Sequence, residues 1–202
     1  MRIASAVVAV AVALGALAGC SVDVPGSARA DPAASAPTPT PSPIPTAPTI
    51  APGFVDPQGR FGITPPSGWR ADTSGTSGTE VIFFGPNADT TDAGEFTPNI
   101  NIVVGPGGSD LEQTIEANRE SLQTLPGYAS TEDLSVTLVD GTPAHILGGT
   151  FTQSGFEVRN VQLFASSGGT DMVVTGTALA ETWDNWEGLF GQTFETFTVQ
   201  PT

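Results

Sequence analysis

The sequence predicts an α+β domain, in which a mainly antiparallel sheet carries a central helix and a C-terminal helix packed on it. Three observations support this fold class. Short strand-like segments come first, and one helix follows them. Four strand-like runs then succeed one another at short spacing, which is typical of an antiparallel meander. A second helix and a short strand end the chain, so helices and strands do not alternate as they do in a doubly wound fold.

Alternation of apolar and polar residues identifies the strands before the first helix. Ile100, Ile102 and Val104 recur at every second position, which predicts a strand with one buried face. Trp69 follows a Pro-Pro-Ser-Gly turn and is an expected core residue. The strands expected in this part of the chain are residues 61–63, 79–84 and 98–104.

The central helix is expected to begin at Ser109, because Ser109 and Glu112 have the spacing of a capping box. Its apolar face is formed by Leu111, Ile115 and Leu122. A Pro-Gly pair after this face stops the helix.

Turns that contain glycine or serine separate the four runs of the meander. A closing helix is expected at residues 181–192, because large apolar residues there follow spacings of three and four. Residues 194–199 predict a last short strand. The four runs are residues 134–139, 144–152, 157–165 and 172–178.

The amino terminus has the features of an export signal. Residues 3–18 are apolar, but they fall short of the ~20 residues that a membrane-spanning helix usually needs. The stretch leads into Leu17-Ala18-Gly19-Cys20, which resembles a lipobox, the motif at which a bacterial prolipoprotein is lipidated and cut. We therefore expect a signal peptide at 1–19, cleavage between Gly19 and Cys20, and a diacylglyceryl group on Cys20. A plain membrane anchor with an incidental cysteine is the less favoured alternative.

Residues 20–53 are expected to tether the lipidated Cys20 to a single globular domain at 54–202. Eight prolines fall within residues 31–52, and such a segment buries too little apolar surface to fold, which favours an open polyproline II spacer. Alternating Thr, Ser and Pro are also typical of O-glycosylated stalks, so a plain and a glycosylated linker both remain open. The expected location is the extracytoplasmic face of the cell membrane.

The charge balance excludes some partners. The chain carries 21 acidic residues against six Arg and no Lys, a formal net charge of −15, and removal of Arg2 with the signal peptide gives −15 − 1 = −16. This charge repels phosphate backbones and anionic lipid, so no nucleic acid is expected as a partner and the lipid on Cys20 must make the membrane contact. A single cysteine also excludes an internal disulfide.

Four motifs accompany the central helix: a Pro-Pro-x-Gly-Trp turn at 65–69, a Pro-Asn-Ile-Asn-Ile strand at 98–102, an Asp-Gly-x-Pro-Ala turn at 140–144 and a Thr-Gly-Thr-Ala strand at 175–178. Together they resemble the PsbP-like fold, an α/β/α sandwich. With the lipobox and the tether, the chain is similar to actinobacterial lipoproteins of the LpqN type. The resemblance covers roughly residues 54–200, and it implies a binding or assembly protein without cofactor or catalysis.

No catalytic constellation stands out in the sequence. His145 is the only histidine, and a Ser-His-Asp site with Asp140 lacks the G-x-S-x-G turn that exposes a nucleophile. We expect His145 to be a strand residue with a local hydrogen bond. Zinc is disfavoured because paired histidines and cysteines are missing. Acidic residues are abundant, but the separation that a glycosidase pair needs does not follow from sequence.

Weaker signals for ligands occur at three places. The acidic loop from Asp89 to Glu95 contains oxygen ligands suited to calcium, but its spacing is not that of an EF-hand, so a solvated loop is favoured and no metal is expected. Glycines at 105–108 precede a helix where an anion could bind, but a Gly-Lys-Ser sequence is missing and the helix cap satisfies those amides. Trp183 and Trp186 are weak candidates for a binding surface, and packing on the sheet is favoured for them.

The sequence thus predicts a membrane-anchored lipoprotein whose domain binds a protein or a cell-envelope component without catalysis. Two alternatives remain, a carboxylate-based envelope hydrolase and a carrier of an apolar ligand between the sheet and the last helix. A large enclosed apolar cavity would favour the carrier, whereas two carboxylates converging in a cleft would favour the hydrolase.

Overall fold

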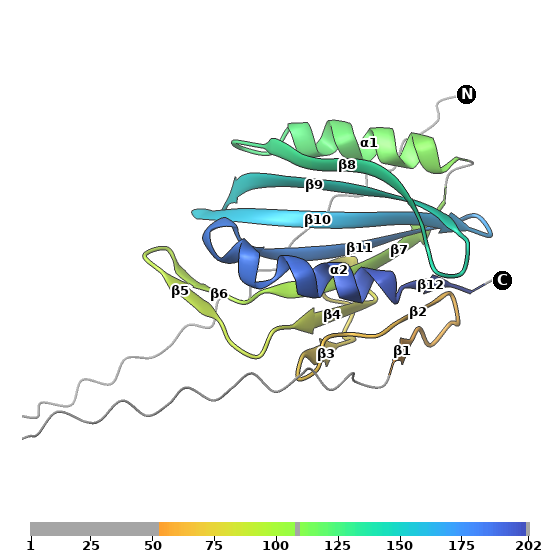
Figure 1. The fold of residues 1–202 in the computed structure, drawn as a ribbon, viewed down its shortest axis with the longest axis horizontal. Coiled ribbons are helices and arrows are strands. Elements are labelled where there is room, and N and C mark those ends of the chain that lie inside the picture. The colour runs from red at the N-terminus through yellow and green to blue at the C-terminus, as the bar shows by residue number, and fades with distance from the viewer. Residues whose placement is uncertain (1–52, 108–109, 201–202) are drawn as a thin grey trace, which may run out of the picture.

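The structure is a computed structural model that describes residues 53–107 and 110–200. Its centre is a seven-stranded sheet, antiparallel throughout (Figure 1). The predicted meander is confirmed, because its four strands pair in chain order along one half of this sheet. In spatial order the strands are β3 (Arg70–Asp72), β4 (Val81–Phe84), β7 (Asn99–Pro106), β11 (Thr170–Leu179), β10 (Phe156–Ser167), β9 (Pro143–Gln153) and β8 (Ala129–Thr137).

Smaller elements surround this sheet. A three-stranded sheet joins the two ends of the domain, since β12 pairs with β2. The remaining strands form one hairpin, β5 with β6. These elements are β1 (Phe54–Val55), β2 (Phe61–Ile63), β12 (Thr198–Val199), β5 (Asp89–Thr91), β6 (Gly94–Phe96), the helices α1 (Leu111–Gln123) and α2 (Glu187–Glu195), and the 3₁₀ segments η1 (Thr76–Gly78) and η2 (Ala180–Asn185).

The two helices cover opposite faces of the large sheet. Leu163 and Phe164 are neighbours in β10, so their side chains point to opposite faces. Phe164 packs in one cluster with Ile115 and Leu122 of α1, whereas Leu163 packs in another with Phe190 and Phe194 of α2. The fold is therefore α+β with an α/β/α layering, as predicted.

Helix α1 differs from its prediction at the start. Its N-cap is Asp110, not Ser109, and the Asp110 carboxylate accepts a hydrogen bond from the amide of Glu112 at 3.1 Å. Ser109 itself lies outside the described residues. An Asp at this position caps as well as a Ser, and its charge interacts favourably with the positive end of the helix dipole. The predicted apolar face is confirmed, with Ile115 and Leu122 buried.

The end of the chain was predicted wrongly in two respects. The expected single helix is divided at Trp186 into η2 and α2, which agrees with the frequent tightening of a helix start into a 3₁₀ turn. Phe194 belongs to α2 and not to the last strand, because it lies one helical turn beyond Phe190 and both rings enter the core. The last strand is accordingly limited to β12.

Strand β8 begins five residues before its predicted start at Leu134 and ends at Thr137. Its first residues are polar and mostly exposed, so the alternation of apolar residues did not show them.

Trp69 is half-buried and packs edge-on against Phe190, in agreement with its expected place in the core. Among the described residues, no helix is long and apolar enough to cross a membrane.

Candidate functional site

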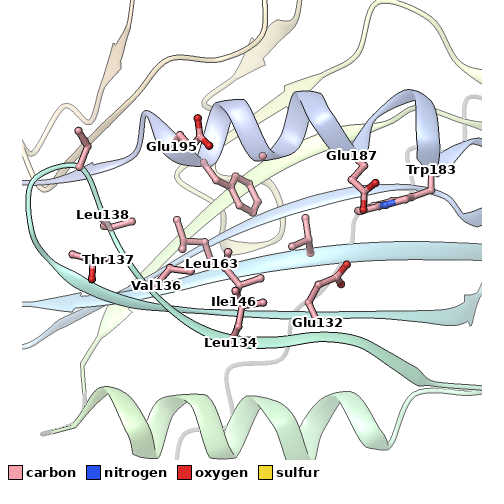
Figure 2. A pocket seen from close by; sticks show the side chains of 14 residues that line it. Glu132, Leu134, Val136, Thr137, Leu138, Ile146, Leu163, Trp183, Glu187 and Glu195 are labelled. Carbon is pink, nitrogen blue, oxygen red and sulfur yellow. The ribbon is translucent and has the colours of Figure 1, made fainter.

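A groove of about 630 Å³ lies between helix α2 and the sheet face formed by β8, β9 and β10 (Figure 2). It is open along one side, where Leu134 is 46% exposed. Most of its lining is apolar, and its carboxylates lie toward the two ends (Figure 2). The lining residues are Glu132, Leu134, Val136, Thr137, Leu138, Val139, Ile146, Val161, Leu163, Trp183, Glu187, Gly191, Phe194 and Glu195.

Strand alternation builds the floor of the groove. Leu134 of β8 lies opposite Ile146 of β9, and Leu163 of β10 lies opposite Ile146 on its other side. Residues at every second position share a face, so Val136 and Val161 join them. Figure 2 shows the labelled apolar side chains pointing toward α2. The result is a continuous apolar floor across three strands.

The turn between β8 and β9 closes one end of the groove. Leu138 and Val139 of this turn line the groove, and Val139 is 75% exposed. Asp140 holds the turn in place, because its carboxylate accepts hydrogen bonds from the amides of Thr142 at 2.8 Å and of Val199 at 2.6 Å. Burial raises the pKa of Asp140, but the hydrogen bonds from these amides together outweigh that effect. The pKa of this carboxyl therefore lies below its usual value.

An ion-pair cluster closes the other end. Arg159 of β10 donates to Glu132, and its Nη2 also lies 3.5 Å from the Glu187 carboxylate of α2. The guanidinium stacks on Trp183, with Cζ 4.6 Å from the ring centroid. The cluster therefore attaches the start of α2 to the sheet beside the groove.

The groove is better suited to binding than to hydrolysis. Glu132 and Glu187 converge in it, which is the feature expected of a hydrolase, but Arg159 lies between them. Glycoside hydrolysis needs a carboxyl acid and a second carboxylate on either side of a sugar bond. Here the space between the two carboxylates is taken by a guanidinium, and the accessible surface of the groove is mostly apolar.

His145 is a buried strand residue with local hydrogen bonds, as expected, but its acidic partner is Asp133 and not Asp140. His145 Nε2 lies 2.8 Å from Asp133, and Nδ1 lies 3.3 Å from the Ser135 hydroxyl. Asp140 is instead committed to backbone amides. Ser135 lies within the extended strand β8 and not on the sharp strand-to-helix turn that exposes a nucleophile. Arg119 also binds Asp133, so the arrangement is a polar network on the sheet.

The acidic loop that contains Asp89 and Glu95 forms the β5–β6 hairpin. Asp89 accepts a hydrogen bond from the Thr182 hydroxyl at 2.9 Å, which attaches this hairpin to η2. In the described part of the chain, no group of three or more His, Cys, Asp or Glu side chains could hold a metal ion.

Gly107, in the glycine segment before α1, donates its amide hydrogen to the Gly169 carbonyl at 2.7 Å, so this amide is not free to bind an anion.

The two tryptophans proposed from sequence have different places. Trp183 is buried, packs on Phe190 with ring centroids 5.4 Å apart, and lines the groove. Trp186 packs against Trp69 at 6.0 Å and does not line the groove. Gly19 and Cys20, with the tether, lie outside the described residues.

Sequence reasoning missed the polar end of the groove. Arg159 and Glu132 are 27 residues apart, and only the pairing of three strands brings them together. One signal was present in the sequence: Arg159 is the only cation in the predicted strand 157–165. A charged side chain in a buried strand usually has a partner.

Solved structures share this fold at low sequence identity. LpqN of Mycobacterium tuberculosis, described as involved in cell envelope biogenesis, matches 78% of this chain and 87% of its own with a TM-score of 0.55 and 19% identity. Cyanobacterial PsbP (CyanoP) from Synechocystis matches 78% of this chain and 97% of its own, with a TM-score of 0.53 and 15% identity. A Pseudomonas aeruginosa protein of unknown function matches 70% and 92%, with a TM-score of 0.50 and 18% identity.

These likenesses show the fold, which is PsbP-like as the sequence motifs predicted. Comparison with curated protein sequences finds no match. The family model described as "Probable lipoprotein LpqN" matches residues 57–174, and that description names no catalytic activity. Because this match spans more than half of the sequence, the chain belongs to the LpqN family of lipoproteins.

Proposed function

We propose that this domain binds the acyl chain of an uncharged envelope lipid in the groove beside α2, without catalysis. The observation that carries the proposal is the apolar floor of a 630 Å³ groove, a volume within the ~300–1,000 Å³ range of small-molecule sites. Apolar side chains reach it from β8, β9, β10 and α2. Binding of an aliphatic chain to such a surface is favourable, because it removes apolar surface from water.

Charge favours an uncharged head group. Glu132, Glu187 and Glu195 line the groove, and among the described residues only Arg159 forms ion pairs with them, to Glu132 and Glu187, so three negative charges against one positive charge leave −2. A free fatty acid would bring a further negative charge into this field. The indole Nε1 of Trp183 is buried and has no hydrogen-bond partner among the described residues, so it can donate to a hydroxyl or ester oxygen.

Membership of a lipoprotein family supports the location of this activity. We propose that Cys20 carries the lipid anchor and that residues 20–53 hold the domain at the extracytoplasmic face of the membrane. A lipid chain is then always within reach of the domain. The role in cell envelope biogenesis described for LpqN of M. tuberculosis agrees with a lipid ligand.

A protein partner is a weaker candidate for this groove. A stable protein interface buries at least ~1,000 Å² and has a large apolar centre. The large apolar side chains that are exposed in the described residues are Val55, Leu134 and Val139, and the last two belong to the groove. A groove with few exposed apolar neighbours is better suited to a narrow chain than to a broad surface.

Two glycines of α2 provide a matched pair of variants to test the proposal. Gly191 lines the groove and Gly188 does not, and a Cβ at either position meets no atom within 4 Å. Gly191→Trp should therefore fill the groove, whereas Gly188→Trp adds the same side chain to the same helix outside it. Both changes should leave the fold intact, because Gly is a poorer helix former than Trp by about a few tenths of a kcal/mol.

The ligand series is a set of monoacylglycerols of increasing chain length, titrated into the full-length protein in a fluorescence displacement assay. Each added methylene that enters the groove contributes ~0.8 kcal/mol, so affinity should rise about fourfold per methylene until the groove is full. Gly191→Trp should weaken binding at least about tenfold, and Gly188→Trp should leave it unchanged. Equal affinity of the two variants, or no dependence on chain length, would refute the proposal.

A further inference from the structure

A second cavity, of about 420 Å³, lies on the opposite face of the sheet from the groove. It lies between α1 with its following turn and strands β9, β10 and β11, and it is partly open to solvent, because the lining residues Ser121, Pro126 and Thr152 are exposed. Asn160 and Gln162 of β10 contribute to it, whereas the intervening Val161 faces the groove. The two spaces are therefore separated by the thickness of one sheet and share no lining residue.

The polar groups of this cavity are buried and lack partners. Gln162 is 1% exposed and Asn160 is 4% exposed, yet their Oε1 and Oδ1 atoms have no hydrogen-bond partner among the described residues. Gln153 Oε1, on the same lining, is also without one. Buried polar atoms are nearly always hydrogen-bonded, because leaving them unpaired costs free energy. Three such atoms around one space can accept hydrogen bonds from a molecule that enters it.

The remaining lining defines the chemistry of this molecule. No charged side chain is present among the described residues that line the cavity, so nothing there compensates an ionic ligand. Leu122 of α1 and Phe151 of β9 contribute apolar surface to the lining. A hydroxyl group both donates and accepts, so it can satisfy either end of a carboxamide. The volume is also far larger than the ~30 Å³ of one water molecule.

We propose that this cavity is a binding site for a small uncharged polyol, held by the carboxamides of Asn160 and Gln162 with its carbon skeleton against Leu122 and Phe151. This site is independent of the acyl-chain groove, because its residues come from the other face of the sheet. Binding of the polyol satisfies the unpaired oxygens and fastens α1 to β10.

The test uses the full-length protein in detergent, titrated with myo-inositol and with glycerol, and followed by NMR of side-chain carboxamide resonances. The Asn160 and Gln162 resonances should move and saturate. Gln162→Met keeps the side-chain length but removes the hydrogen-bonding groups, so it should weaken binding about tenfold or more. Gln192→Met makes the same substitution at an exposed position of α2 and should bind as the unaltered protein does.

Folding of the variants is checked by their melting temperatures. Gln162→Met should melt at or above the temperature of the unaltered protein, because it removes a buried polar group without a partner. The proposal is overturned if neither polyol shifts the two carboxamide resonances to saturation, in which case water alone fills the cavity. It is also overturned if Gln162→Met binds as tightly as Gln192→Met.

Discussion

Gly176 lies in β11 directly beneath Phe190 of α2, and adding one methyl group there should destabilise the fold. A Cβ at this position would lie 2.8 Å from Cγ and 2.9 Å from Cδ1 of Phe190. Carbon atoms in contact prefer ~3.5–4.0 Å, so the ring must retreat by somewhat under an ångström. Phe190 is fully buried, and Trp183 and Trp69 pack against it, so it has no room for this movement.

Overpacking of this kind costs ~1–3 kcal/mol. We therefore expect Gly176→Ala to lower the free energy of unfolding by about 2 kcal/mol, which for a domain of this size corresponds to a fall of about 4–8 °C in the melting temperature. Guanidinium unfolding curves measure the first quantity and calorimetry the second. The mutation should also displace α2 and change affinity in the adjoining groove.

Gly105→Ala is the matched control, because it changes a glycine of the same sheet where a Cβ would meet nothing within 4 Å. It should leave stability unchanged or raise it slightly. Adding Phe190→Leu to Gly176→Ala should recover part of the loss, since a smaller side chain makes room for the methyl group. The reasoning is refuted if Gly176→Ala and Gly105→Ala unfold within about 0.5 kcal/mol of each other.

Three other predictions concern charged groups and the anchor. Asp56 is 2% exposed and accepts from both Nε and Nη2 of Arg60, so Asp56→Ala should cost about 3 kcal/mol in urea unfolding, and a loss under about 1 kcal/mol would contradict this. The Arg119 guanidinium lowers the pKa of Asp133 from 3.8 to about 2, so this pair stabilises the fold above pH 3.8 and ceases to do so as the pH falls toward 2. Arg119→Gln should return the Asp133 pKa toward 3.8 in an NMR titration, although the effect on stability should be small because Asp133 is 42% exposed. Cys20→Ser should move the protein out of the membrane fraction or leave it unprocessed, and a variant that is processed and acylated normally would defeat the assignment.

Sequence patterns were most informative where a strand had one apolar face. The strands that became β9, β10 and β11 were located because apolar residues recur along them, and their turns contain glycine. Strands β3, β5 and β6 were missed, since each has three residues and mixed polarity. Such short segments form strands only because a neighbouring strand supplies the hydrogen bonds, which is a property of the folded sheet.

The two cavities could not be derived from the sequence for a different reason. Polar residues that alternate with apolar ones in a strand normally face water. In β10, Asn160 and Gln162 occupy the polar positions, yet α1 covers them, so the polar face of the strand is buried. The groove likewise depends on where α2 lies across the sheet, which the amphipathic pattern of a helix does not specify.

The groove exists because the sheet is wider than the helix that covers it. Phe190 contacts Gly176 of β11, and Figure 1 shows α2 crossing in front of β11 and not in front of β8 or β9. A helix with its side chains is ~10 Å wide and neighbouring strands are ~4.8 Å apart, so one helix covers about two strands. Strands β8 and β9 continue the same apolar face beyond the reach of α2, with Leu134, Val136 and Ile146. An edge strand usually carries polar side chains on a face that meets water. Exposing these apolar side chains to water therefore costs free energy unless an apolar molecule lies over them.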